Sequence, residues 1–277
     1  MAVIAGTTSC DDFLDREPMS SISPETYYST AAQLEANLND EYPNVLPSFG
    51  QWTYGIFGED KGTDNQIEVN ANDRYTQDRW KVPHSESDNW KFERIYRINF
   101  FLSEALPKFG EDMSGSQNTI SGSVATIKHY IGEMYFLRAY EYFKKLQLFG
   151  DFPIINQPLA DEMEALREAS KRFPRNEVAR FIISDLDKAY AYMSDVDMAT
   201  TRINKDAAML VKSRVALFEA TWLQNFKGTA FVPGGEGWPG ASLHNNYQYP
   251  SGNIDNEVKY FLEQAVEASK LVADKYK

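Results

Sequence analysis

A single long helical pattern between Val124 and Leu148 constrains the fold of this chain more than any other feature. Its apolar residues recur at helical spacing and cover a wide face: Ile127, Tyr130, Ile131, Met134, Leu137, Tyr142, Phe143 and Leu146. Such a face is wide enough to be buried against more than one partner helix. The segment 149–153 (FGDFP) then carries the glycine and proline that close helices. The sequence therefore predicts a central buried helix.

The same spacing predicts further helices on both sides of this one. Ser23, Pro24 and Glu25 are typical of a helix start, and a stripe follows them up to about Tyr42. Asp88 is a candidate cap for a second helix, which Pro107 and Gly110 end. Three more are expected over 177–193, 205–223 and 257–276. No segment shows the alternation of a strand, so the fold class is all-α.

Two long irregular regions interrupt the helices, at 43–83 and 225–256, and both are rich in glycine and aromatic residues. Irregular segments of this length in a compact domain are usually functional or disordered, and the aromatic content favours function. Consecutive helices suggest tetratricopeptide-like pairs stacked in a solenoid, although no fixed period of about 34 residues is visible. The last helix reaches the end of the sequence without a closing repeat, so we expect an N-terminal part of a longer protein.

Composition limits the partners of the chain. With 277 residues, 43% of them hydrophobic, the chain can bury a full core. A formal net charge of −12 argues against nucleic acid and against direct adhesion to anionic membranes, because both are negatively charged. No apolar stretch approaches the length of a membrane-spanning helix. Any tie to a membrane is therefore expected to be a lipid anchor.

The only cysteine, Cys10, is the candidate for that anchor. It follows a small, apolar, uncharged segment (1–9, MAVIAGTTS) and precedes an abruptly acidic one. An apolar run, small residues and then cysteine are typical of the cleavage site of a bacterial lipoprotein precursor. The alternative is a buried free cysteine, which is harder to arrange beside two aspartates. We expect 1–9 to be a residual signal segment and 10–277 to be one helical domain.

Several motifs, taken in order, resemble the SusD/RagB family of outer-membrane lipoproteins of Bacteroidetes. They cover nearly the whole chain: 10–18 (CDDFLDREP), 90–99, 133–143 (EMYFLRAYEYF) with 149–153, 173–189, 202–208 and 213–221. The resemblance implies a cell-surface protein that binds oligo- or polysaccharide and delivers it to a partner TonB-dependent, SusC-like transporter. It also implies that Arg138 and Glu141 belong to the helical scaffold and do not contact the ligand.

Sugar recognition needs flat aromatic faces and a rim of carboxylates, amides and guanidinium groups. The region 43–83 supplies such a set, and the family's N-terminal ligand contacts fall in this region. The candidate ligand-binding residues are Trp80, Asp64, Asn65, Asp60, Tyr75 and Arg74. The alternative is that Trp80 packs the loop onto the helices while the charges are solvated. The second loop, with Trp238, Tyr247 and Tyr249, can face either the ligand or the transporter.

Catalysis and metal binding have little support in the sequence. The three histidines, His84, His129 and His244, form no HExxH or paired metal spacing, and there is no GxSxG elbow. We expect His129 to be packed or on the surface. The segment 60–65 loosely resembles a calcium loop without its required glycine and glutamate. We therefore expect no cofactor, no metal and no enzyme activity. A peptide-binding relative and a helical polysaccharide-degrading enzyme stay as alternatives.

Overall fold

The structure is a computed structural model that describes residues 27–47, 89–110, 112–194 and 198–277. Within these ranges the fold is all-α, as the sequence predicted, and two isolated bridges are the extent of β pairing. The helices are α3 (Ala31–Val45), α4 (Glu93–Phe109), α5 (Val124–Phe149), α6 (Met163–Ala169), α7 (Arg175–Tyr192), α8 (Lys205–Asn225), the 3-10 turn η3 (Pro239–Ser242) and α9 (Ile254–Lys275).

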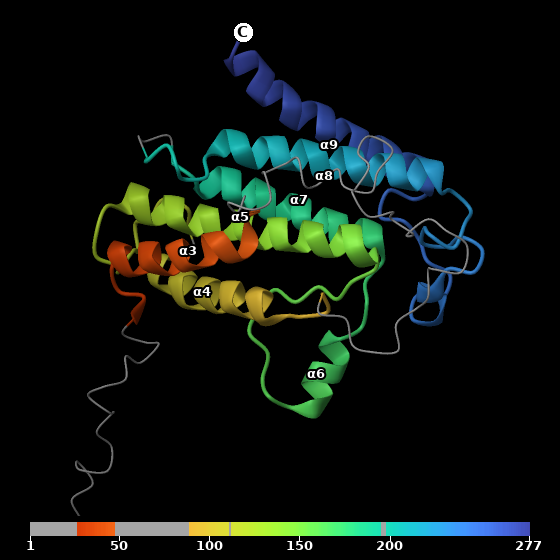
Figure 1. The fold of residues 1–277 in the computed structure, drawn as a ribbon, viewed down its shortest axis with the longest axis horizontal. Helices are drawn as coiled ribbons and strands as arrows, with labels where there is room; N and C mark the ends of the chain where they lie inside the picture. The colour runs from red at the N-terminus through yellow and green to blue at the C-terminus, as the bar shows by residue number, and fades with distance from the viewer. Residues whose placement is uncertain (1–26, 48–88, 111, 195–197) are drawn as a thin grey trace, which may run out of the picture.

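Helix α5 lies at the centre of the stack (Figure 1). Helices α3 and α4 pack on one side of it and α7 on the other, then α8 packs on α7 and α9 on α8. This order explains why α5 is buried along most of its length, including polar positions such as Glu133 and Arg138. The expectation that its face meets more than one partner helix is confirmed. The successive packing of α7, α8 and α9 is the tetratricopeptide-like arrangement that the sequence suggested.

Helix α3 differs at both ends from the predicted helix. It begins at Ala31, where Thr30 and Gln33 form a capping box, and backbone hydrogen bonds to Ser121 hold the preceding residues out of the helix. It also continues past Pro43 to Val45. A proline near the C-terminal end removes only one hydrogen bond of the helix. Pro107 lies inside the last turn of α4 for the same reason.

A buried network around Arg138 joins α5 to α4 and α7. The Arg138 guanidinium on α5 donates to both carboxylate oxygens of Asp185 on α7, at 2.6 and 2.8 Å, and also to Asn99 on α4, at 2.9 Å. Glu141 is buried one turn further on, within 3.4 Å of Lys145. The prediction that Arg138 and Glu141 serve the scaffold is confirmed. Of the helices in the described ranges, none is long and apolar enough to span a membrane.

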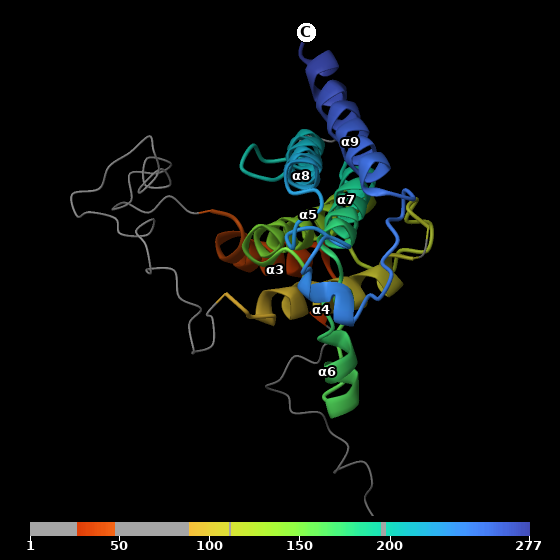
Figure 2. The same cartoon turned by 90° about the vertical axis from the view of Figure 1, so that its right-hand side faces the viewer.

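The helix α6 was not predicted, and it projects away from the stack (Figure 2). It is only one to two turns long, and none of its residues is buried. The loop that joins α8 to α9 and contains η3 lies at one end of the helical stack, at the right in Figure 1. This loop brings its aromatic residues to the ends of α5, α7 and α8, where the candidate site lies.

Candidate ligand-binding cleft

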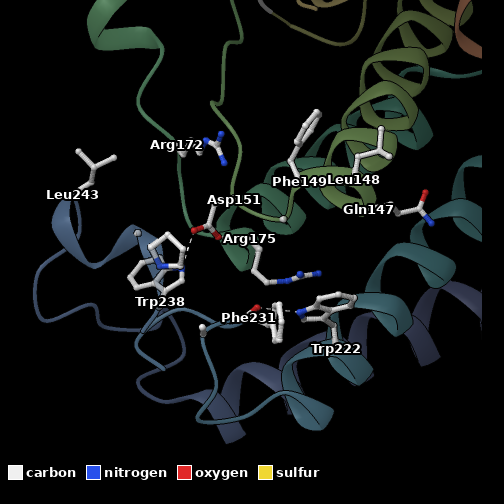
Figure 3. Close-up of a pocket in the computed structure, with 14 residues that line it drawn as sticks. Gln147, Leu148, Phe149, Asp151, Arg172, Arg175, Trp222, Phe231, Trp238 and Leu243 are labelled. Carbon is white, nitrogen blue, oxygen red and sulfur yellow. Dashed lines mark hydrogen bonds between the residues drawn. The ribbon is translucent and has the colours of Figure 1, made fainter. Parts of the chain in front are cut away.

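A cleft of about 760 Å³ lies where the C-terminal ends of α5 and α8 meet the start of α7 and the loop between α8 and α9 (Figure 3). Its lining joins residues from four separate parts of the chain: Gln147, Leu148, Phe149, Gly150, Asp151, Arg172, Arg175, Trp222, Ala230, Phe231, Trp238, Pro239, Gly240 and Leu243. Aromatic faces and hydrogen-bonding groups therefore share one concave surface, which is the combination that ligand sites use.

The apolar part of the cleft includes side chains that solvent reaches. Phe231 is 61% exposed, and Leu148 and Leu243 are exposed as well. Trp222 is half-buried, and its indole nitrogen donates to the Phe231 carbonyl at 3.1 Å. That bond holds the backbone carrying Phe231 beside the end of α8. The Phe231 ring is thus an accessible flat face at a fixed place in the cleft.

Asp151 joins the two sides of the cleft through its two carboxylate oxygens. One oxygen accepts from the Trp238 indole nitrogen at 2.7 Å, and the other from the backbone N–H of Arg175 at 2.9 Å. The second bond caps α7, because Pro174 at its N-cap position provides no side-chain cap. Burial raises the pKa of Asp151. The two hydrogen bonds, and the positive charges of Arg175 and Arg172, oppose this shift.

Arg175 lies beneath the cleft in a closed arrangement. Its guanidinium donates to both oxygens of the buried Glu219 carboxylate at 2.9 to 3.2 Å, and it stacks 4.1 Å from the Trp222 ring centre. Burial raises the pKa of Glu219, and the Arg175 charge opposes this effect. The Arg175–Glu219 pair positions Trp222 and forms the floor of the cleft. The hydrogen bonds of the pair are made within the protein.

Arg172 is placed differently, at the exposed rim of the cleft. Its guanidinium lies 4.6 Å from the ring centre of Trp90, which itself packs edge-on against Phe149 and Phe152. The Arg172 carbonyl lies 2.8 Å from Nε2 of His244, in the loop between α8 and α9. Both contacts hold the residue where its guanidinium N–H groups reach the cleft.

The loop between α8 and α9 is anchored by side chains whose polar ends point inward. The Tyr249 hydroxyl donates to the Pro233 carbonyl at 2.7 Å. The Tyr247 hydroxyl forms hydrogen bonds with the side-chain amide of Asn176. Trp238 is only 5% exposed, and its ring lies so close to Gly240 that a Cβ there would be 2.2 Å from it. Trp238, Tyr247 and Tyr249 therefore build the loop, and Phe231 is the ring that the loop offers to a ligand.

The six candidate ligand-binding residues of the 43–83 region all lie outside the described residues. These are Trp80, Asp64, Asn65, Asp60, Tyr75 and Arg74, and Cys10 does too. Their roles stay predictions. Of the two expectations for His129, packed or on the surface, the structure shows the first: His129 is buried and lies 3.0 Å from the Ile203 carbonyl. In the described ranges no group of three or more His, Cys, Asp or Glu side chains could hold a metal ion.

Sequence reasoning missed Asp151, Arg172 and Phe231. Asp151 was assigned to the motif that ends the central helix, and Arg172 stands in a linker without periodicity. The available signal was the cluster of glycine and aromatic residues after α8, which was recognised as a possible ligand loop without the specific ring.

The comparisons with known proteins identify the class. The model of the SusD-like family, described as "Starch-binding associating with outer membrane", matches residues 12–217. The chain therefore belongs to this family of carbohydrate-binding proteins associated with the outer membrane. The match includes Asp151, Arg172 and Arg175 and ends before Trp222, so the second wall of the cleft lies beyond it.

Among curated proteins, the chain is similar to two SusD-like proteins of Formosa agariphila, P25 and P2. It is 25% identical to P25 over 233 residues, covering 77% of this chain and 41% of the relative. It is 26% identical to P2 over 235 residues, covering 80% and 43%. The chain thus spans about two fifths of the length of these relatives.

Solved structures of SusD-like proteins also resemble the chain. One from Bacteroides fragilis has a TM-score of 0.47 at 18% identity and covers 76% of this chain and 40% of its own. A laminarin-binding SusD-like protein has a TM-score of 0.37 at 20% identity, and the match covers 48% of this chain and 26% of that protein.

Proposed function

We propose that this chain is the helical part of a cell-surface lipoprotein that captures an oligo- or polysaccharide in the cleft and delivers it to a TonB-dependent transporter. Membership of the SusD-like family supports the carbohydrate as ligand. The single observation that carries the proposal is the exposed Phe231 ring in a cleft that also holds Arg172 and Gln147. A sugar has a flat C–H face for such a ring and hydroxyls for such polar groups.

The predicted residues of the 43–83 region fit the same proposal as a second part of the ligand site. Trp90 contacts Arg172 at the rim of the cleft, and Lys145 donates to the Asn89 carbonyl at 2.7 Å. These described residues follow the 43–83 region closely in the chain, which supports the idea that the region contributes to the cleft. Trp80 would then add a second aromatic platform, with Asp60, Asp64, Asn65, Arg74 and Tyr75 around it.

Calorimetric titration with maltohexaose and a panel of other neutral glycans tests the proposal. We expect Phe231→Ala to weaken binding by about tenfold or more, because ring stacking and burial of the ring are both lost. Leu271→Ala on α9 is the matched control, since Leu271 is similarly exposed but does not line the cleft. Equal affinity of wild type and Phe231→Ala would show that the glycan does not bind in this cleft. Trp80→Ala then tests binding at the 43–83 region.

The same titrations separate the alternatives. Released reducing ends during incubation would favour the polysaccharide-degrading enzyme. Binding of peptides with no response to any glycan would favour the peptide-binding relative.

Lipid anchoring through Cys10 is proposed from the sequence alone. A Cys10→Ala variant, expressed with its native leader in a Bacteroidetes host, is expected to leave the outer-membrane fraction. Co-purification with a TonB-dependent transporter from the unchanged strain tests delivery. Retention of Cys10→Ala in the membrane fraction would contradict the anchor.

A further inference from the structure

We propose that the cleft recognises an anionic group on its sugar ligand, either the carboxylate of a uronic acid or a sulfate ester, and that Arg172 binds this group. The inference rests on the proposed glycan function and goes beyond it by naming the class of sugar. Both groups present coplanar or clustered oxygens to which a guanidinium can donate two hydrogen bonds at once.

The distribution of charge in the cleft selects Arg172. Arg175 is neutralised by Glu219, which is fully buried beneath it. Asp151 has both oxygens occupied, by the Trp238 indole and by the backbone N–H of Arg175. In the described part of the chain, Arg172 has no carboxylate within ion-pair distance, although it lines the cleft. Among the described residues that line the cleft, Arg172 is therefore the cation that is not held in an ion pair.

The environment of Arg172 also prepares it for a directed contact. Stacking on Trp90 covers one flat face of the guanidinium and leaves its edge, which carries the N–H groups, for a ligand. The backbone is fixed next to it, because Phe173 and Phe152 exchange hydrogen bonds at 3.0 and 3.2 Å. Figure 3 shows Arg172 on the α7 side of the cleft and Phe231 on the side of the loop between α8 and α9. A glycan that lies across the cleft can thus contact Phe231 on one side and Arg172 on the other.

The negative charge of the whole chain means that an anionic ligand needs a local cation such as Arg172 to bind. A net charge of −12 disfavours the approach of any anion. The charge of Asp151 interacts with that of Arg172, but both oxygens of Asp151 accept hydrogen bonds from other groups. An arginine that is held in place and forms no ion pair with a described carboxylate can donate to a ligand that brings its own negative charge.

Ligand-observed NMR with monosaccharides tests the inference without depending on glycan linkage. The probes are glucose, glucuronate, the neutral methyl ester of glucuronate and glucose 6-sulfate. We expect glucuronate or glucose 6-sulfate to bind about tenfold more tightly than glucose, and the methyl ester to behave like glucose. The two anionic probes distinguish a carboxylate from a sulfate as the natural group.

Three variants complete the test. Arg172→Gln should abolish the preference for the anion, Arg172→Lys should retain only part of it, and Arg167→Gln on α6 should leave it intact as a charge-matched control. The preference should also fall with added salt. Equal binding of glucose and the anionic probes, lost in Phe231→Ala, would overturn the inference and leave the proposed function standing. Failure of every saccharide to bind would overturn both.

Discussion

The Trp238 indole and the Asp151 carboxylate are bonded at 2.7 Å across 87 residues of sequence. Trp238 belongs to the loop between α8 and α9, whereas Asp151 follows α5 and also caps α7. One short hydrogen bond thus sets the distance between the two sides of the cleft. Stability and ligand binding are expected to depend on it together.

Trp238→Phe is predicted to lower the stability of the fold and to weaken ligand binding. Phenylalanine keeps most of the ring packing but cannot donate, so one oxygen of the half-buried Asp151 loses its partner. We expect a loss of about 1–3 kcal/mol in the free energy of unfolding, measured by urea denaturation, and weaker glycan binding. A double-mutant cycle with Asp151→Ala should show coupling of about 1 kcal/mol. Additive effects of the two substitutions would contradict this role.

Glu257 is predicted to make the stability of the α7–α9 contact depend on pH. Burial alone would raise its pKa, but hydrogen bonds from Arg180, Asn176 and Ser251 outweigh burial and lower it. An acid with a lowered folded-state pKa stabilises the fold above its unfolded value of about 4.3 and loses that contribution as the pH falls through the folded value.

The measurement is the free energy of unfolding at a series of pH values between neutrality and about pH 3. Wild type should lose more stability than Glu257→Gln over this window, because glutamine has no proton to bind. Glu263→Gln on the exposed side of α9 is the control and should follow wild type. Parallel curves for wild type and Glu257→Gln would contradict the prediction.

Arg138→Leu is predicted to destabilise the scaffold strongly without changing the cleft. The substitution leaves Asp185 fully buried with its main counter-charge removed, which costs about 3–5 kcal/mol. The double variant Arg138→Leu with Asp185→Leu should recover much of the loss, because both buried charges are then absent. Glycan affinity of the folded fraction should stay unchanged, and a selective loss of affinity would place Arg138 in the ligand site instead.

Gly132→Ala is predicted to disturb the contact between α5 and the end of α7. A Cβ at position 132 would lie 2.8 Å from the Met193 backbone nitrogen and 2.9 Å from the Ala189 carbonyl oxygen. Because backbone atoms yield less than side chains, we expect a loss of about 1–3 kcal/mol in thermal or chemical unfolding. An unchanged midpoint would show that the two helices can separate at little cost.

The sequence predicted the helices whose ends carry strong local signals. Ser123 caps α5 and Gly150 ends it, so the predicted range of 124–148 differs from the observed one by a single residue. Local rules failed where a distant contact decided the outcome. The start of α3 depends on backbone hydrogen bonds to Ser121, which lies some ninety positions further on. Pro43 and Pro107 were read as breaks because the position of a proline within the last turn is not visible from its spacing.

The candidate cleft was harder to predict than the fold, for a physical reason. Its parts come from four separate regions, and contacts such as His244 with Arg172 join residues 72 positions apart. Periodicity reports which side of a helix is buried, but not which helix ends meet. The composition of the second aromatic loop indicates a possible ligand contact, but it does not distinguish the inward Trp238 from the exposed Phe231.

The way in which the loop between α8 and α9 is held has a consequence for the evolution of specificity. Its anchors at Trp238, Tyr247 and Tyr249 bond to the helical stack or within the loop, whereas Phe231 and Leu243 bear little of that support. Mutations at the two exposed positions can therefore change what the cleft accepts while the anchors preserve the fold. A gene duplicate of this protein could acquire a new ligand through a few substitutions at such positions, at almost no cost in stability.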